Sequence, residues 1–177
     1  MEQTAAVSPQ GRKPVQTPAG EYGVFQALYP SLRRFAAVIA DLDTDPDDLV
    51  QDALAATLAK HQLHKLDNPA AYLKRAMVNA TSDKRRRAGL FRSLLPRLGQ
   101  DASTIDSYPS DLSFLDDLAP LDRAILYLAE VEGVAHEQIA TELKLTPAAV
   151  RKRASRARKK LRESLDDDLS PLPEGST

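Results

Sequence analysis

Apolar residues recur at every third or fourth position in several separate stretches of the chain, which is the spacing of one face of an α-helix. This spacing predicts helices over about 21–39, 45–58, 68–87 and 120–131, each with a polar opposite face. Two of them begin with a capping residue followed by proline, which favours a helix start. No stretch alternates between apolar and polar residues as a strand would. We therefore expect an all-α fold.

Residues 135–161 contain the most informative pattern, two short amphipathic helices separated by a tight turn. Their apolar stripes consist of Ile139, Ala140 and Leu143 in the first helix, and of Val150, Ala154, Ala157 and Leu161 in the second. Thr146 and Pro147 predict the start of the second helix. Lys144 stands where such a turn often has glycine, so the turn contains either a left-handed lysine or another conformation. The pattern predicts a helix-turn-helix.

The second of these helices is strongly basic, since eight of the twelve residues 151–162 are arginine or lysine. A helix with a narrow apolar seam and outward cations can enter the major groove of DNA. The candidates for contacts with base edges are Arg151, Lys152, Ser155 and Arg156. The candidates for phosphate contacts are Thr146, Arg153, Arg158 and Lys159. The alternative is a basic face that is only solvated, but the cap, the two stripes and the confined cations together favour DNA binding.

Charge is segregated along the chain, although the net charge is only −1 from 24 basic and 25 acidic residues. Aspartates cluster in 41–52, in 111–122 and in 166–168, whereas cations cluster in 84–87 and 151–162. Sorting of this kind predicts two partners of opposite character, a polyanion at the basic faces and a protein at the acidic one.

The pattern divides the chain into two small helical domains joined by a flexible linker. Residues 1–20 and 166–177 are rich in polar residues, proline and glycine, and we expect both tails to be disordered. The first domain is expected over 21–88 and the second over 114–165. Between them, 89–113 is the expected linker, with one loose apolar turn.

Composition excludes several kinds of function. The chain has no cysteine, and its three histidines form no metal-ligand pattern, so we expect no metal. No nucleophile–base pair and no glycine-rich phosphate loop is present, so we expect neither an enzyme nor a cofactor. No apolar run approaches the roughly 20 residues that span a bilayer, and no signal-peptide core precedes the first helix. We expect no membrane insertion and a cytoplasmic location.

The order of these segments resembles bacterial extracytoplasmic-function (ECF) sigma factors, small promoter-specificity subunits of RNA polymerase. The stretch DPDDLVQDAL (45–54) is similar to the family's polymerase-binding helix, and NPAAYLKRAMVNATSDKRRR (68–87) to its helix for the −10 promoter element. The stretch LAPLDRAILYLAEVEGVAHEQIATEL (118–143), with the basic helix after it, is similar to the domain that reads the −35 element. The resemblance thus implies a region 2-like domain followed by a region 4-like domain.

The resemblance also implies partners and site residues. Promoter DNA and the β′ and β subunits of core polymerase are the implied partners, and many members of the family are held by an anti-sigma protein. The implied core-binding residues are Asp47, Asp48, Gln51 and Asp52. The implied residues for the −10 element are Lys65, Asn68, Asn79, Asp83, Lys84, Arg86 and Arg87. The basic helix with Thr146 would read the −35 element.

Two departures and one alternative remain at this point. The family usually has large aromatic residues where this chain has Leu54 and Leu58, and tryptophan where it has Tyr72. Each charged face also has a simpler interpretation as a solvated helix surface that suits the helix dipole. A stand-alone helix-turn-helix regulator would account for the second domain equally well, but it leaves the acidic helix and the basic helix of the first domain unexplained.

Overall fold

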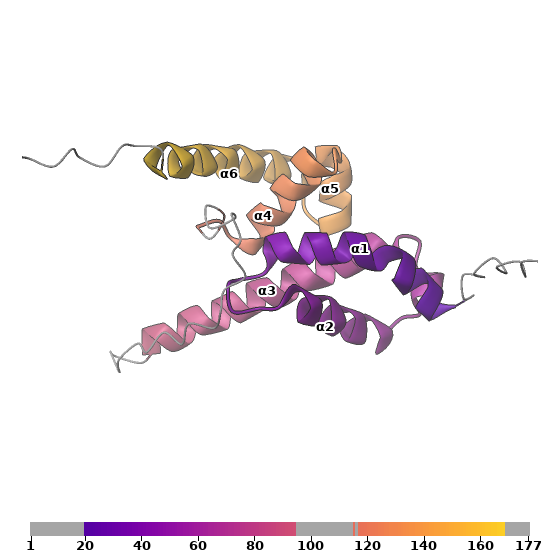
Figure 1. Cartoon of the computed structure of the whole chain (residues 1–177). Helices are drawn as coiled ribbons and strands as arrows, with labels where there is room; N and C mark the ends of the chain where they lie inside the picture. Colours follow the sequence, from indigo (N-terminus) through magenta and orange to yellow (C-terminus); the bar gives the residue numbers. More distant parts are fainter. Residues whose placement is uncertain (1–19, 95–114, 116, 169–177) are drawn as a thin grey trace, which may run out of the picture.

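The computed structural model describes residues 20–94, 115 and 117–168. Its first domain contains α1 (Glu21–Ile39), α2 (Pro46–Leu58), a short 3-10 turn, η1 (Leu63–Lys65), and the long α3 (Pro69–Leu94). Helices α1, α2 and α3 pack against one another, and the end of α3 projects beyond α2 (Figure 1).

The second domain is also helical. It contains α4 (Pro120–Leu126), which continues as a π-helical segment, η3 (Tyr127–Val131), followed by α5 (His136–Leu143) and α6 (Pro147–Asp168). Helix α6 packs on both α4 and α5 and lies at the edge of the molecule farthest from α2 (Figure 1). Within the described ranges every regular element is a helix, which confirms the all-α fold.

Local sequence signals account for three of the helix starts. The Asp45 carboxylate accepts a hydrogen bond from the Asp47 amide at 2.7 Å, and Pro46 is the first residue of α2. The Asn68 side-chain oxygen accepts from the Ala71 amide at 2.9 Å at the start of α3. The Thr146 hydroxyl accepts from the Ala149 amide at 3.2 Å at the start of α6. Each cap satisfies an amide that the helix itself leaves without a partner.

The turn between α5 and α6 settles the question that Lys144 raises in the sequence. Lys144 adopts the left-handed conformation, with φ 55° and ψ 48°, so the turn keeps its usual geometry despite the side chain. The Leu145 amide donates to the Ala140 carbonyl at 2.8 Å, which closes the end of α5. The expected helix-turn-helix is therefore present. The stripe of α5 shares a buried cluster with Val150 and Ala154, whereas Ala157 and Leu161 pack in a second cluster with Leu126.

One hydrophobic core extends through both domains. Phe35 of α1 and Leu128 of the second domain are fully buried, and both belong to the same cluster. The Phe35 and Tyr127 rings meet edge to face, with 5.7 Å between their centroids. Ile139 and Val150 continue the cluster into the helix-turn-helix. The two domains thus touch through apolar side chains in addition to being linked by the chain.

Some positions differ from what helical spacing predicts. Leu58, the last residue of α2, is 43% exposed, whereas its neighbour Thr57 is buried. Val131 is 69% exposed, since the wider turns of η3 shift the apolar stripe out of phase. Ala80 is exposed beside the inward-facing Met77 and Thr81.

The observed helices also extend past the predicted domain boundaries. Helix α3 continues to Leu94, into the predicted linker, and α6 continues to Asp168, into the predicted tail. The remainder of the predicted linker and tails (1–19, 95–114 and 169–177) lies outside the described residues, so their expected disorder stays a prediction.

Candidate nucleic-acid and polymerase interfaces

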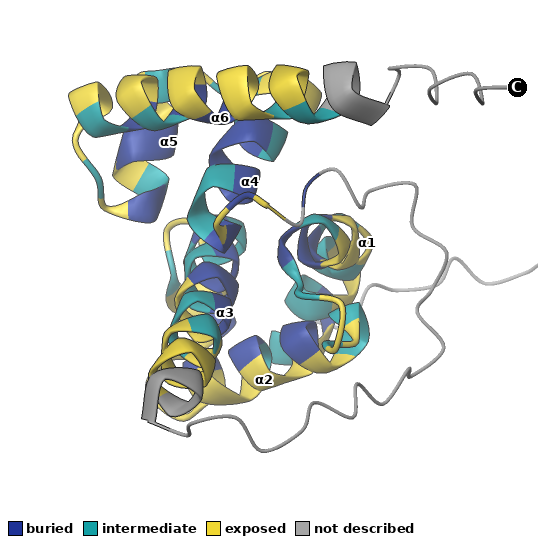
Figure 2. Ribbon diagram, turned by 90° about the vertical axis from the view of Figure 1, so that its left-hand side faces the viewer, coloured by how far each residue is buried: buried dark blue, intermediate teal, exposed yellow. Residues whose placement is uncertain are grey.

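The exposed side of α6 gathers most of the residues predicted to read the −35 element. Val150, Ala154 and Ala157 are buried against the rest of the second domain, which fixes the rotation of the helix. The opposite side therefore points outward over its whole described length (Figure 2). The exposed residues of the predicted set are Thr146, Arg151, Lys152, Ser155, Arg156, Arg158 and Lys159.

Acidic residues of neighbouring helices hold three of the cations of α6. Arg151 pairs with Glu137 of α5 at 2.9 Å, and Arg158 pairs with Glu130 of η3. Arg153 is half-buried and donates to Asp122 of α4 at 2.8 Å. Pairs at the surface add little to stability, but they restrict the directions in which these guanidinium groups point. Arg153 is placed to join α6 to α4, which its sequence position alone did not indicate.

A shallow hollow of about 280 Å³ lies beside this pair and is rich in positive charge. Lys152, Arg153 and Arg156 line it together with Asp122 and Ala149. Three cations converging on one hollow suit an anionic oxygen such as that of a phosphate.

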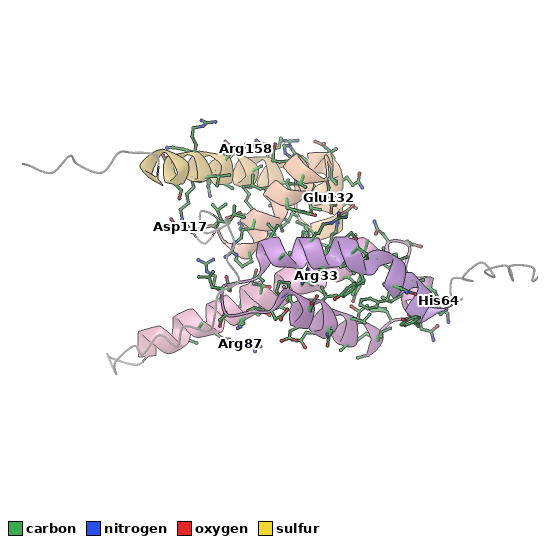
Figure 3. All side chains as sticks on the ribbon, viewed as in Figure 1. Arg33, His64, Arg87, Asp117, Glu132 and Arg158 are labelled. Atoms are coloured by element: carbon green, nitrogen blue, oxygen red, sulfur yellow. The ribbon has the colours of Figure 1, made fainter. Side chains whose placement is uncertain are left out.

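The basic end of α3 forms a second cationic surface, on the part of the helix that projects from the molecule (Figure 3, Arg87). Lys84 donates to the Thr44 hydroxyl at 2.7 Å and lies 3.3 Å from the Asp43 carboxylate. Arg86 pairs with Asp83 one turn earlier on the same helix. Asn79 and Arg87 are exposed, so most of the predicted −10 residues share this end of the molecule.

The other two predicted −10 residues lie at the opposite end of α3. Lys65 is exposed on η1, and Asn68 uses its side-chain oxygen to cap α3. Beside them, the Tyr72 ring lies between the His61 ring, 5.0 Å away between centroids, and the Arg75 guanidinium, 4.9 Å above it. The structure thus divides the predicted −10 set between two ends of one helix.

Of the four residues of α2 that are predicted to bind core polymerase, one is held by α1 and three are exposed. Asp47 accepts hydrogen bonds from the Tyr29 hydroxyl at 2.7 Å and from Arg33 at 2.8 Å, both on α1 (Figure 3, Arg33). The Tyr29 hydrogen bond lowers the pKa of Asp47, and Arg33 acts in the same direction. Asp48, Gln51 and Asp52 are exposed. Asp47 therefore fixes α2 on α1, while the other three form an open polar face.

Comparison with known proteins shows which proteins the chain is similar to. Residues 112–161 match the family model described as "Sigma-70, region 4". Over 144 residues the chain is 27% identical to the ECF RNA polymerase sigma factor SigE of Mycolicibacterium smegmatis, covering 75% of this chain. The chain therefore contains a segment that matches sigma-70 region 4, and it is similar in sequence to an ECF sigma factor. It spans 56% of the length of that relative.

Solved structures share the fold of this chain. The sigma factor RpoE of Bartonella quintana, solved with the anti-sigma factor NepR, superposes with a TM-score of 0.61 at 23% identity, over 82% of this chain and 96% of that one. CnrH, solved with the cytosolic domain of CnrY, gives a TM-score of 0.52 at 27% identity, over 82% and 86% of the two chains. PhyRSL of Sphingomonas sp. Fr1, solved with NepR, gives 0.53 at 20% identity, over 86% and 93%.

Among the described residues, no group of three histidine or acidic side chains is placed to hold a metal ion. None of the described helices is both long enough and apolar enough to cross a bilayer.

The sequence did not predict the residues that hold the charged faces in place. Tyr29 and Arg33 fix Asp47, and Asp122 fixes Arg153, in each case from another helix. Helical spacing on a single segment gives no signal for such partners. Asp122 is 31 positions before Arg153, with η3 and α5 between them, so the sequence does not indicate their ion pair.

Proposed function

We propose that this chain binds core RNA polymerase and directs it to promoters by reading the −10 element with its first domain and the −35 element with its second. The observation that carries the proposal is the outward cationic face of α6, on a helix-turn-helix within the stretch that matches sigma-70 region 4. The acidic face of α2 and the basic end of α3 precede it in the order that the ECF family requires.

In the second domain, α6 would enter the major groove with its exposed side toward the bases. Arg151, Lys152, Ser155 and Arg156 are the proposed base readers, because arginine and lysine suit the acceptors on guanine. Lys159, Arg158 and the Thr146 end of the helix would contact phosphates and set the register. Arg153 contributes through its pair with Asp122, since that pair sets the angle of α6 on α4 and leaves its charge beside the hollow.

In the first domain, the projecting end of α3 would hold the phosphates of the opening duplex through Lys84, Arg86 and Arg87. Asn79, on the same helix, would hydrogen-bond a DNA base, and Asp83 would orient Arg86. At the other end of α3, Lys65 and Asn68 would flank an extruded base. The Tyr72 ring, supported by His61 and Arg75, offers a flat apolar surface close to that loop.

The acidic face of α2, formed by Asp48, Gln51 and Asp52, would dock on a basic surface of the polymerase β′ subunit, with Asp47 holding the helix in place from behind. The β subunit would contact the second domain. RNA synthesis itself would stay with the polymerase, so the chain would work as a specificity subunit in the cytoplasm and not as an enzyme. RpoE and PhyRSL were solved with NepR, and we extend an anti-sigma partner to this chain by that likeness.

Run-off transcription tests the function directly. Core polymerase is incubated with the full chain and a pool of templates with randomised upstream sequence, and the transcripts are sequenced. We expect transcripts whose templates share two separated motifs, and no such enrichment with core polymerase alone. A lack of any chain-dependent transcript, while the chain still binds DNA, would instead indicate a stand-alone regulator.

Charge reversal tests the docking face of α2. The double variant Asp48→Lys/Asp52→Lys should keep its helical circular dichroism and lose association with core polymerase in a pull-down, because both side chains are exposed and point away from the core. Asp117→Lys, at an exposed acid outside α2 (Figure 3), is the matched control and should bind normally. Equal retention of the double variant and the control would exclude this face.

A further inference from the structure

The loop 59–68, which joins α2 to α3, contains two of the proposed −10 residues, Lys65 and Asn68. Its two ends are fixed by the helices that flank it. At the first end, the His61 amide donates to the Thr57 carbonyl at 2.8 Å, and at the second end the side chain of Asn68 caps α3. The middle of the loop, η1, is not part of either helix, so its position depends on contacts with another element.

Glu21, the first residue of α1, provides such a contact through both oxygens of its carboxylate. Oε2 accepts a hydrogen bond from the Leu63 amide at 2.6 Å, and Oε1 lies 2.5 Å from Nδ1 of His64. His64 lies beside the start of α1, at the other end of the first domain from Arg87 (Figure 3). One carboxylate of α1 thus holds two consecutive residues of η1, which are 42 and 43 positions further along the chain.

The side chain of Leu63 anchors the same point from the inside. It is fully buried and belongs to the core cluster on which Val24, Phe25 and Leu66 also pack. The hydrogen bond of its amide is partly buried, so removing the acceptor leaves a donor that water satisfies incompletely. The Glu21 hydrogen bond and the buried side chain therefore fix Leu63 together.

A fixed Leu63 also fixes the proposed reading residues that follow it. The Leu66 amide donates to the Leu63 carbonyl at 3.1 Å, which closes the turn around Lys65. A base is recognised by the direction of hydrogen bonds, so the side chains that read it must be held in place by the residues around them. Displacement of η1 would therefore move Lys65 and Asn68 relative to the Tyr72 ring.

We propose that Glu21 is a positioning residue for recognition of the −10 element: it holds the loop 59–68 in the shape that lets its two exposed polar residues flank an extruded base. Its role in base reading rests on the proposed function, whereas its hold on the loop does not. The simpler interpretation is an acid that only suits the positive end of the α1 dipole. That interpretation needs charge alone, whereas the hold on the loop needs a hydrogen-bond acceptor, and substitution by glutamine separates the two.

Amide hydrogen exchange, followed by NMR on the whole chain without a partner, tests the hold on the loop. Glu21→Ala should speed exchange of the Leu63 amide on the order of tenfold, because the amide loses its acceptor while the core stays folded. Glu21→Gln keeps an oxygen acceptor and should stay within about threefold of the parent.

Two further variants control the exchange measurement. Tyr22→Ala, at a 65% exposed position in the same turn of α1, is the matched control and should change nothing. Glu21→Met keeps the length of the side chain without an acceptor, so it should exchange as fast as Glu21→Ala and takes its place if that variant loses its helical circular dichroism. Unchanged exchange at Leu63 in the folded alanine or methionine variant would overturn the proposal.

Base preference in the −10 element tests the role in recognition. Core polymerase is incubated with each variant and with templates that are randomised only in the −10 element, and the transcripts are sequenced. Glu21→Ala should reduce the preference for one base, at one −10 position, on the order of five- to tenfold and leave the other positions unchanged. A purely structural role would lower transcription from all templates equally. Glu21→Gln should keep the preference of the parent, and a glutamine variant as relaxed as Glu21→Ala would overturn the proposal in favour of charge alone.

The two measurements distinguish failure of this inference from failure of the proposed function. If the parent directs transcription with a −10 preference that Glu21→Ala retains at every position, the proposed function stands and the role of Glu21 fails. If the parent directs no transcription while Glu21→Ala speeds exchange at Leu63, the proposed function fails. The role of Glu21 in base reading then fails with it, although its hold on the loop stands.

Discussion

The two basic surfaces of the chain are supported in different ways. Helix α6 packs on two other helices of its own domain, and acidic residues of α4, η3 and α5 hold Arg153, Arg158 and Arg151. The basic end of α3 projects from the bundle: Arg86 bonds to the same helix, Lys84 to the loop before α2, and Arg85 to the Leu118 carbonyl before α4.

This difference in support indicates which task each basic surface suits. Side chains that reach base edges must be held in a fixed direction, because a base is recognised by the geometry of its hydrogen bonds. Side chains that hold phosphates need only be near a line of negative charge. Packing on α4 and α5 fixes the direction of α6, which therefore suits sequence reading, and the projecting end of α3 suits the changing backbone of a duplex that opens.

The largest expected effect concerns the core that both surfaces share. Phe35→Ala removes a fully buried ring that contacts Tyr127 of the other domain, and it should lower the free energy of unfolding by about 3–5 kcal/mol. Leu58→Ala, at an exposed apolar position, should change it by less than about 0.5 kcal/mol. Urea denaturation followed by circular dichroism measures both. A small loss for Phe35→Ala would mean that the two surfaces do not depend on a common core.

The next effect separates the supported surface into readers and anchors. Arg151→Ala should weaken binding to the preferred −35 duplex by about 1–3 kcal/mol and relax the preference at one base pair. Lys159→Ala should weaken binding to preferred and scrambled duplexes alike, since phosphates are present in both. Fluorescence anisotropy with the two duplexes measures the difference. Equal losses on both duplexes for both variants would contradict this division.

The same contrast between local and distant support explains what the sequence could predict. The starts of α2, α3 and α6 follow from Asp45, Asn68 and Thr146, because a cap and its helix are neighbours in the chain. The outward face of α6 follows from the spacing of its own apolar residues.

Distant pairs could not be predicted in this way. The ion pair of Lys74 with Glu132 joins residues 58 positions apart, and that of Arg123 with Asp41 joins residues 82 positions apart. Both acids also look like ordinary members of solvated acidic stretches. The different surroundings of Asp47 and Asp48 could not be predicted for the same reason, because the partners of Asp47 are Tyr29 and Arg33 on another helix.

A smaller effect concerns the start of the reading helix. Thr146→Ala removes the cap of α6 and should lower the free energy of unfolding by about 1 kcal/mol, whereas Thr146→Ser should retain most of it. Asp45→Ala at the start of α2 should lower the free energy of unfolding by at least as much. The Asp45 carboxylate accepts a shorter hydrogen bond, at 2.7 Å, and its charge also suits the helix dipole. Thermal unfolding of the three variants ranks them. A Thr146→Ala variant as stable as its parent would show that the helix start depends on packing alone.

The smallest expected effect has the opposite sign and lies in the turn that orients α6 on α5. Lys144 has a left-handed backbone, which costs a residue with a Cβ on the order of 1 kcal/mol, and its side chain is exposed. Lys144→Gly removes this strain but gives the unfolded chain more freedom, so the net gain in stability should be only about a few tenths of a kcal/mol up to 1 kcal/mol. Lys144→Ala keeps the strain and should gain nothing, which makes it the matched control in the same denaturation measurement. Since neither change touches the exposed face of α6, DNA preference should stay constant in both variants. A glycine variant that is less stable than the alanine variant would mean that the turn relaxes to another conformation in solution, and the fixed direction of the α6 cations would then need a different support.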